Sequence, residues 1–155
     1  MDSLFALTPA GYERLQAEYK MLSGERMMTL IARIEEAKSG ADLVENTELL
    51  SALEELKNLN ARISRLSYVL NHAELISSVE QDGYVHLGSR VTIQFQDEEA
   101  ESFYLVGTIE ADPDAGFLSD ASPLGQAVLN RLSSPEYLEF ETPGGIRKFR
   151  ILHVE

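Results

Sequence analysis

The stretch KSGADLVENTEL, residues 38–49, decides the fold of this chain. It separates two long segments in which apolar residues recur at helical spacing, residues 9–39 and about residues 46–76. Two long helices joined by a short connection pack as antiparallel neighbours. The sequence therefore predicts a helical hairpin with residues 38–49 at its far end.

The far end of the predicted hairpin is acidic. Asp42, Glu45 and Glu48 are spaced by three residues, and residues three apart share one face of a helical turn. Two interpretations are open: a functional tip, or an acidic turn that keeps a loop in water. Acidic residues are common on protein surfaces, so the spacing alone does not choose between them.

The first helical segment has a narrow apolar seam that changes phase once. Thr8 is a suitable N-cap, and Pro9 suits the first helical position. At Ser23-Gly24 the seam shifts by one residue, which predicts one helix with a local adjustment, ended by Gly40. The seam consists of Tyr12, Leu15, Tyr19, Leu22, Met27, Leu30, Ile31, Ile34 and Ala37.

The second helical segment has a similar seam. Asn60 and Ser67 interrupt it, and Leu59 and Leu66 flank it. Asn60 either fixes the pairing register, as buried polar residues do in coiled coils, or lies partly exposed beside the seam. The predicted seam consists of Leu49, Leu53, Leu56, Ile63 and Leu70.

The pattern becomes strand-like in the second half of the chain. Residues 77–83 are polar and indicate a linker, and Pro143-Gly144-Gly145 predicts a hairpin turn because glycine tolerates positive φ. The expected elements are strands at 84–95, 103–109, 137–142 and 146–154, a loop at 112–122 and a helix at 123–132.

Ser122 or Asp120 can cap the short helix, with Pro123 at its first position. We therefore expect an α+β chain of two domains, a helical hairpin at residues 1–77 and a compact domain at residues 78–155.

The chain is strongly acidic, with a formal net charge of −13. Residues 1–77 carry −4 of this charge and residues 78–155 carry −9. Binding to bare nucleic acid needs a basic face for the phosphates, so the composition opposes unguided binding to RNA or DNA. It suits a basic protein partner or metal ions instead.

The sequence has no cysteine, which excludes disulfides, thiolate metal sites and cysteine nucleophiles and fits a reducing cytosol. Residues 1–10 lack the basic and apolar regions of a signal peptide. No apolar run approaches the length of about 18 residues that a membrane span requires. We therefore expect a cytoplasmic protein without a membrane segment. We also expect it to be a monomer.

Asp42 and Glu45 are the strongest candidates for a site. Two carboxylates suit Mg²⁺ or Mn²⁺ but leave most of the coordination shell open, so a partner has to complete it. The histidines, His72, His86 and His153, fall in different elements without ligand spacing, and we expect structural or surface roles for them.

Basic residues line the first helical segment. They either guide RNA or belong to a mixed-charge solvated face that needs no function. These residues are Lys20, Arg26, Arg33 and Lys38.

Several motifs, in order along nearly the whole chain, resemble the bacterial Gre transcript-cleavage factors. ADLVENTEL at residues 41–49 is similar to the GDLxENAEY tip of that family, and LTPAGYERL at residues 7–15 is similar to its opening. The other matches are IARIEEAK at 31–38, AELI at 73–76, SDASPLGQAVL at 119–129 and FETPGGIRKFRI at 140–151.

The resemblance implies a helical hairpin followed by an FKBP-like domain that docks on RNA polymerase at the mouth of its secondary channel. The hairpin would enter the channel and meet the RNA 3′ end only within that complex. Asp42 and Glu45 would help hold a second Mg²⁺ or Mn²⁺, shared with the polymerase, for cleavage of backtracked RNA by two-metal hydrolysis. Asp120, Ser122 and Pro123 match the polymerase-facing loop. The protein would modulate the active site of the polymerase and have none of its own.

The tip departs from the family pattern. Ala41 replaces a glycine, Leu49 replaces a tyrosine and Val44 fills a usually polar position, while Leu53 and Leu56 stand where basic or polar residues often occur. Some Gre-factor homologues with an altered acidic tip inhibit the polymerase or promote pausing, and ASPLG and AGYERL resemble that branch as well. The resemblance therefore leaves cleavage stimulation and inhibition or pausing open. A prolyl isomerase, the third alternative, needs an aromatic-lined pocket, and this chain has no Trp.

Overall fold

The computed structural model describes residues 5–40, 46–76 and 79–155. The described residues form two compact units, one made of residues 10–73 and the other of residues 5–9 and 74–155. The expected domains at 1–77 and 78–155 differ from this division, because residues 5–9 and 74–76 group with the second unit.

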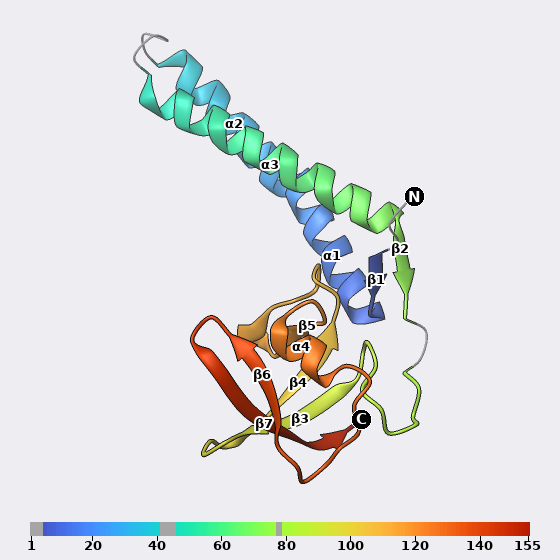
Figure 1. Cartoon of the computed structure of the whole chain (residues 1–155). Coiled ribbons are helices and arrows are strands. Elements are labelled where there is room, and N and C mark those ends of the chain that lie inside the picture. The colour runs from blue at the N-terminus through green and yellow to red at the C-terminus, as the bar shows by residue number, and fades with distance from the viewer. Residues whose placement is uncertain (1–4, 41–45, 77–78) are drawn as a thin grey trace. The chain divides into compact units, whose positions relative to one another are not determined.

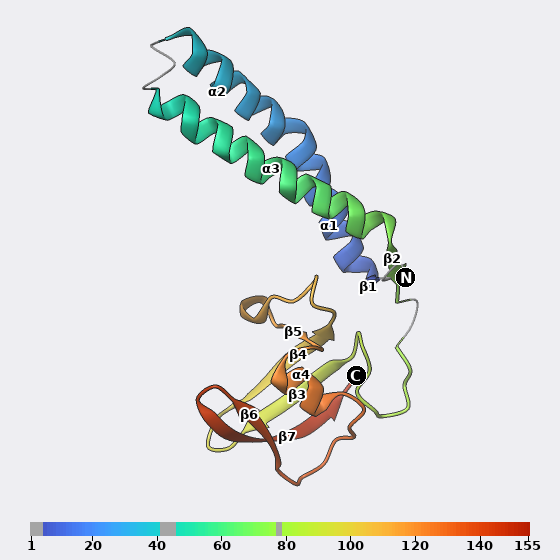
Figure 2. The ribbon, with the colours of Figure 1, turned by 45° about the horizontal axis from the view of Figure 1, so that its top comes forward.

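The first unit is a helical hairpin. Its first arm runs continuously through α1 (Pro9–Met21), the π-helical segment Leu22–Arg26 and α2 (Met27–Ser39), and its second arm is α3 (Thr47–Asn71). α2 and α3 lie side by side in Figures 1 and 2. No helix within the described residues is long and apolar enough to cross a membrane.

The π-helical segment explains why the apolar seam changes phase. A π turn contains one residue more than an α-helical turn over the same rise. That extra residue brings Met27 to the face that Leu22 occupies, and Leu30, Ile34 and Ala37 then follow as buried residues. The prediction of one helix with a local adjustment is confirmed.

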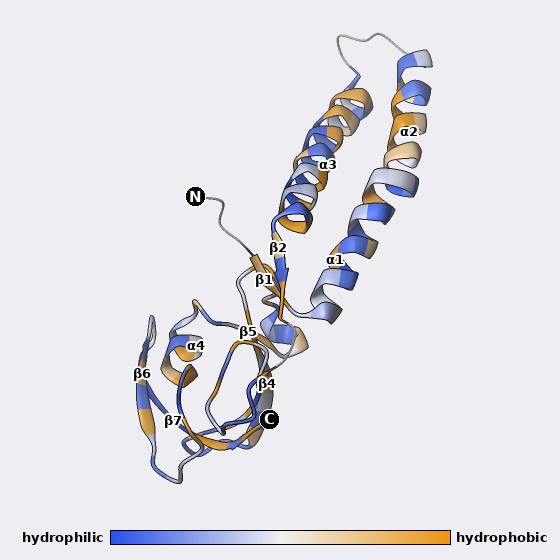
Figure 3. Ribbon diagram, turned by 90° about the vertical axis from the view of Figure 1, so that its right-hand side faces the viewer, coloured by the Kyte–Doolittle hydropathy of each residue, from blue (hydrophilic) through white to orange (hydrophobic). Residues whose placement is uncertain are grey.

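The buried face of α3 differs from the predicted seam. Leu59 and Leu66 are buried, whereas Leu53 is 42% exposed and Asn60 is exposed. Ala52, which the prediction passed over, has no exposed surface. Because alanine contributes little to an apolar pattern, the sequence indicates Leu53 rather than Ala52 as the seam position. Of the two alternatives for Asn60, the exposed position is the correct one. Figure 3 shows polar and apolar residues recurring along α2 and α3.

The second helix ends at Asn71, before the predicted end at residue 76. The next residues form β2 (Ala73–Leu75), which pairs with β1 (Phe5–Leu7) in a two-stranded sheet. The N–H of Ile76 extends this pairing by donating to the Leu7 carbonyl at 2.8 Å. A segment with a helical pattern thus becomes a strand because a distant part of the chain satisfies its backbone groups.

The second unit contains a five-stranded sheet in the order β5-β4-β3-β7-β6, with α4 packed against its core (Figure 1). β4 and β5 are parallel, and the other neighbouring strands are antiparallel. The α+β prediction is confirmed. The elements are β3 (Arg90–Phe95), β4 (Ala100–Val106), the 3₁₀ turn Pro113–Ala115, β5 (Phe117–Ser119), α4 (Pro123–Val128), β6 (Leu138–Thr142) and β7 (Gly145–Val154).

The core of the second unit follows the alternation of strand residues. Val91, Ile93 and Phe95 of β3 are buried, and β7 contributes Phe149 and Ile151 from the neighbouring strand. Successive side chains of a strand point to opposite faces, so one face of β3 and β7 supplies the core. Complete burial of one such side chain contributes about 2 kcal/mol.

Three predicted elements of the second half have clearly different bounds in the structure. The strand expected at 103–109 is β4, Ala100–Val106. The strand expected at 84–95 begins only at Arg90, because Gly83 and Gly88 adopt positive φ values of 86° and 95° that interrupt an extended chain. The helix expected at 123–132 ends at Val128, since Asn130 has a φ of 61°.

β5 lies inside the region that was predicted to be a loop. It has only three residues, too few to show alternation, and it forms by pairing in parallel with β4. The turn predicted at Pro143-Gly144-Gly145 is confirmed: Thr142 pairs with Gly145 at the end of the β6–β7 hairpin, and Gly145 has a φ of 120°.

Candidate functional site

The two helices are joined where they reach the acidic tip. Asn46 is the N-cap of α3, and its Oδ1 accepts a hydrogen bond from the Leu49 N–H at 3.0 Å. Its Nδ2 donates to the carbonyl of Ala37, near the end of α2, at 2.7 Å. One side chain therefore caps one helix and holds the other. Asp42 and Glu45, the predicted metal ligands, lie outside the described residues.

An acidic hollow flanks this capping residue. It is lined by Glu36, Ala37, Gly40, Asn46 and Glu48. Glu36 comes from α2 and Glu48 from the first turn of α3, where the helix dipole favours a carboxylate. The described residues on either side of residues 41–45 in the sequence thus include two exposed carboxylates, Glu36 and Glu48.

Three of the four basic residues singled out in the first arm have acidic partners within the hairpin. Arg26 and Arg33 both pair with Glu55, the latter at 2.9 Å, and Lys38 pairs with Glu35 at 3.7 Å. Exposed pairs of this kind contribute about 0–1 kcal/mol each. These contacts favour the mixed-charge face over a guide for RNA.

The loop between β5 and α4 and the first residue of α4 contain the three residues that were matched to a polymerase-facing loop. Ser122 is the N-cap of α4: its Oγ accepts from the Gly125 N–H at 3.0 Å and donates to the Ser119 carbonyl at 2.6 Å. Pro123 is exposed in the first turn of the helix, and Asp120 is half-buried. Ser122 thus has a structural role in addition to any contact with a partner.

Gly125 explains how closely α4 packs against β5. A Cβ atom at this position would lie 1.9 Å from the carbonyl oxygen of Ser119. No side chain fits there without movement of the backbone, so the start of α4 packs directly on the backbone that ends β5.

Comparisons with known proteins identify the family. The model "Transcription elongation factor, N-terminal" matches residues 5–75, and "Transcription elongation factor, GreA/GreB, C-term" matches residues 80–155. Transcription elongation factor GreA of Ruegeria pomeroyi is 34% identical over 150 residues, which cover 96% of this chain and 96% of that protein. The chain belongs to the GreA/GreB family of transcription elongation factors.

Other relatives match this GreA/GreB family member over a similar length. Transcription elongation factor GreA of Thermotoga neapolitana is 36% identical over 149 residues, which cover 96% of this chain and 95% of that protein. Among solved structures, GreA factor homolog 1 (Gfh1) of Thermus thermophilus is 30% identical, with 99% of both chains covered and a TM-score of 0.45. The resemblance drawn from the motifs is confirmed at the level of the family.

Leu49, one of the residues that depart from the Gre tip pattern, is buried in the structure. Leu49 stands where the cleavage factors have a tyrosine, and it is buried in the hairpin core with 7% exposure. Its N–H is the group that Asn46 caps. At this position the GreA/GreB family member therefore uses an apolar residue for packing.

The histidines of this GreA/GreB family member lie apart, as the sequence indicated. His72 stacks on Tyr68 with ring centroids 4.2 Å apart, and the Nε2 of His153 lies 3.3 Å from a carboxylate oxygen of Glu155. The third histidine, His86, contacts two carboxylates, an arrangement that the sequence analysis missed. The available signal was the spacing of Glu80 and Asp82, in the predicted linker, and His86, in the strand predicted at 84–95, within seven residues.

Proposed function

We propose that this protein enters the secondary channel of RNA polymerase and stimulates cleavage of backtracked RNA through Asp42 and Glu45. The observation that carries the proposal is membership of the GreA/GreB family together with the DLVEN acids at the end of a helical hairpin. The hairpin supports it physically, because Asn46 ties α2 and α3 together next to those acids. The protein would act as a monomer and meet the RNA 3′ end only inside the complex.

The donor chemistry of the tip fits a hard divalent ion. Asp42 and Glu45 offer carboxylate oxygens, which Mg²⁺ and Mn²⁺ prefer, and Glu36 and Glu48 add negative charge beside them. Two carboxylates leave most of an octahedral shell open, so the polymerase has to supply the rest. When bound, the ion supplies Lewis-acid activation of water and stabilises the charge that develops during phosphodiester hydrolysis.

The second unit would provide the docking surface. Asp120 lies in the loop before α4 and Pro123 in the first turn of α4, where Ser122 caps the helix and Gly125 packs against β5, so a partner would meet a well-defined surface. A rigid loop loses little conformational entropy on binding. The strongly acidic balance of residues 78–155 suits a basic surface on the polymerase.

A backtracked elongation complex tests the proposal directly. Asp42→Asn and Glu45→Gln are expected to abolish stimulated RNA shortening while polymerase affinity is retained, because only transition-state support is removed. Glu54→Gln is the matched control: it removes one charge from an exposed position of α3 that does not line the acidic hollow, and it should leave cleavage unchanged. Cleavage by both tip variants at the wild-type rate would refute a role for the acids.

A pausing or inhibitory homologue is the second candidate. It is favoured by the packing of Leu49 in the hairpin core and by Ala41 and Val44 in the tip sequence. In that case the wild-type protein gives no shortened RNA and instead slows nucleotide addition. Asp42→Asn or Glu45→Gln should then relieve the slowing in a primer-extension time course.

The prolyl isomerase alternative is disfavoured by the packing of the aromatic residues. Phe95 and Phe149 are buried, and Phe140 packs on both, with ring centroids 6.2 and 5.4 Å away. These rings fill the core of the second unit and are therefore not free to line a substrate pocket. A peptide isomerisation assay with the whole chain checks this, and we expect no acceleration.

A further inference from the structure

Buried groups hold the loop at residues 79–89 in a defined shape. Val85 has no exposed surface, and its N–H donates to the carbonyl of Arg131 at 2.9 Å. Ser89 is also fully buried, and its Oγ accepts from the N–H of His86 at 3.0 Å. The backbone that carries His86 is therefore fixed on both sides by the core of the second unit.

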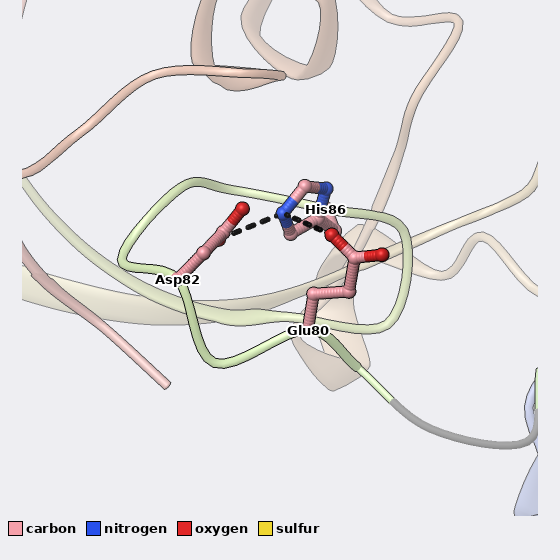
Figure 4. A group of neighbouring side chains, drawn as sticks. All are labelled: Glu80, Asp82 and His86. Atoms are coloured by element: carbon pink, nitrogen blue, oxygen red, sulfur yellow. Dashed lines mark hydrogen bonds and ion pairs between the residues drawn. The ribbon is translucent and has the colours of Figure 1, made fainter.

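Three side chains of this loop converge on one point (Figure 4). The Nε2 of His86 lies 2.9 Å from Oδ1 of Asp82 and 3.8 Å from Oε2 of Glu80. One ligand atom from each residue lies within 4.8 Å of the other two. The Tyr84 N–H donates to Asp82 Oδ1 at 2.9 Å, and this bond, together with the contact to His86, holds the pKa of Asp82 below its ordinary value.

We propose that Glu80, Asp82 and His86 form a binding site for a divalent transition-metal ion, with Zn²⁺ as the best-matched ion. One imidazole nitrogen and two carboxylate oxygens suit Zn²⁺ and its neighbours, whereas Mg²⁺ and Ca²⁺ prefer oxygen ligands alone. The three protein ligands leave one position of a tetrahedral shell for water or a partner group.

The observed spacing is close to what a bound ion requires. Ligands about 2.1 Å from a tetrahedral ion lie about 3.4 Å from one another. The separations of 2.9 and 3.8 Å at His86 lie on either side of that value. Glu80 has the freedom to close the difference, because its side chain is 78% exposed, while His86 is only 29% exposed.

This site is independent of the acidic tip. Its ligands belong to the second unit and lie within seven residues of one another, while Asp42 and Glu45 belong to the segment between α2 and α3. An ion at this site would cross-link residues 80–86, which follow the two-stranded β1–β2 sheet in the chain. We therefore expect it to stabilise the second unit and to have no part in RNA cleavage.

The test uses the untagged full chain with both tip acids replaced, Asp42→Asn and Glu45→Gln, so that the tip contributes no ligand. Calorimetric titration with Zn²⁺ is expected to show one equivalent bound. Titration with Co²⁺ should give the visible absorption of a site with a nitrogen ligand. In this background His86→Gln or Asp82→Asn should weaken Zn²⁺ binding at least about tenfold.

His153→Gln is the matched control, because His153 also has a carboxylate neighbour, but only Glu155 among the described residues. Zn²⁺ affinity unchanged in this variant and reduced in His86→Gln supports the site. Glu80→Gln alters the most exposed of the three ligands, so we expect this variant to keep the fold. Circular dichroism checks that it does. Absence of Zn²⁺ binding, or equal affinity with and without His86, overturns the proposal and leaves the three residues as a hydrogen-bonded surface cluster.

Discussion

Asn46→Ala is expected to destabilise the tip end of the hairpin by about 2 kcal/mol, because it removes two hydrogen bonds at once. Loss of an N-cap side chain costs about 1 kcal/mol, and here the cap is the bond from the Leu49 N–H to Asn46 Oδ1 at 3.0 Å. The second bond, from Asn46 Nδ2 to the Ala37 carbonyl at 2.7 Å, contributes about 1 kcal/mol more.

Asn46→Asp separates the two contributions. Aspartate keeps an oxygen acceptor for the N–H of Leu49 and caps helices as well as asparagine does. It cannot donate to the Ala37 carbonyl, so the expected loss is about 1 kcal/mol, half that of the alanine variant. The control is Asn60→Ala, on the exposed face of α3, where we expect a change within about 0.5 kcal/mol.

Urea unfolding followed by far-ultraviolet circular dichroism measures these differences, because the helical signal comes mainly from α1, α2 and α3. Equal midpoints for Asn46→Ala and Asn60→Ala would refute the stabilising role of the bridge. If Asn46→Ala and Asn46→Asp lose the same free energy of unfolding, the N-cap bond to the Leu49 N–H contributes nothing. In the cleavage assay, Asn46→Ala should lower stimulation while polymerase binding persists, since the acids then project from a looser end.

Three further predictions concern the second unit and the net charge. Asp120→Lys should weaken binding to purified polymerase in a fully folded protein, whereas Ser122→Arg should also lower the unfolding temperature because it removes the cap of α4. Unchanged affinity of the lysine variant would remove this loop from the docking surface. Gly125→Ala should destabilise the second unit by about 3 kcal/mol in thermal unfolding, because its Cβ overlaps the Ser119 carbonyl; a wild-type melting temperature would contradict this packing. The free protein, with net charge −13, should bind RNA or DNA only weakly in a gel-shift assay at physiological salt, and tight salt-sensitive binding would contradict a protein partner.

Local signals in the sequence determined the features that depend on neighbouring residues. The apolar spacing predicted the hairpin, and its phase shift at Ser23-Gly24 predicted the adjustment that the structure contains as the π-helical segment. Ser122 was one of two expected caps and is the one observed, and Pro143-Gly144-Gly145 predicted the β6–β7 turn. Each of these depends on backbone preferences or hydrogen bonds within a few residues, which a sequence displays directly.

The tip acids illustrate how far the sequence reaches into the candidate site. Asp42 and Glu45 were selected by residue type, spacing and family resemblance, and their role stays a prediction because they lie outside the described residues. The structure adds the capping bond and the interhelical bond of Asn46, which the sequence did not single out.

Only the tertiary structure decided the features that depend on distant partners. β2 became a strand because β1 pairs with it, β5 because β4 lies beside it, and Ala52 entered the hairpin core because α2 packs closely there. The convergence of Glu80, Asp82 and His86 likewise depends on a loop whose shape is set by the burial of Val85 and Ser89. β2 and Ala52 depend on residues far along the chain, and the loop at residues 79–89 depends on the carbonyl of Arg131, to which Val85 bonds. A local pattern of residue types carries no information about such contacts.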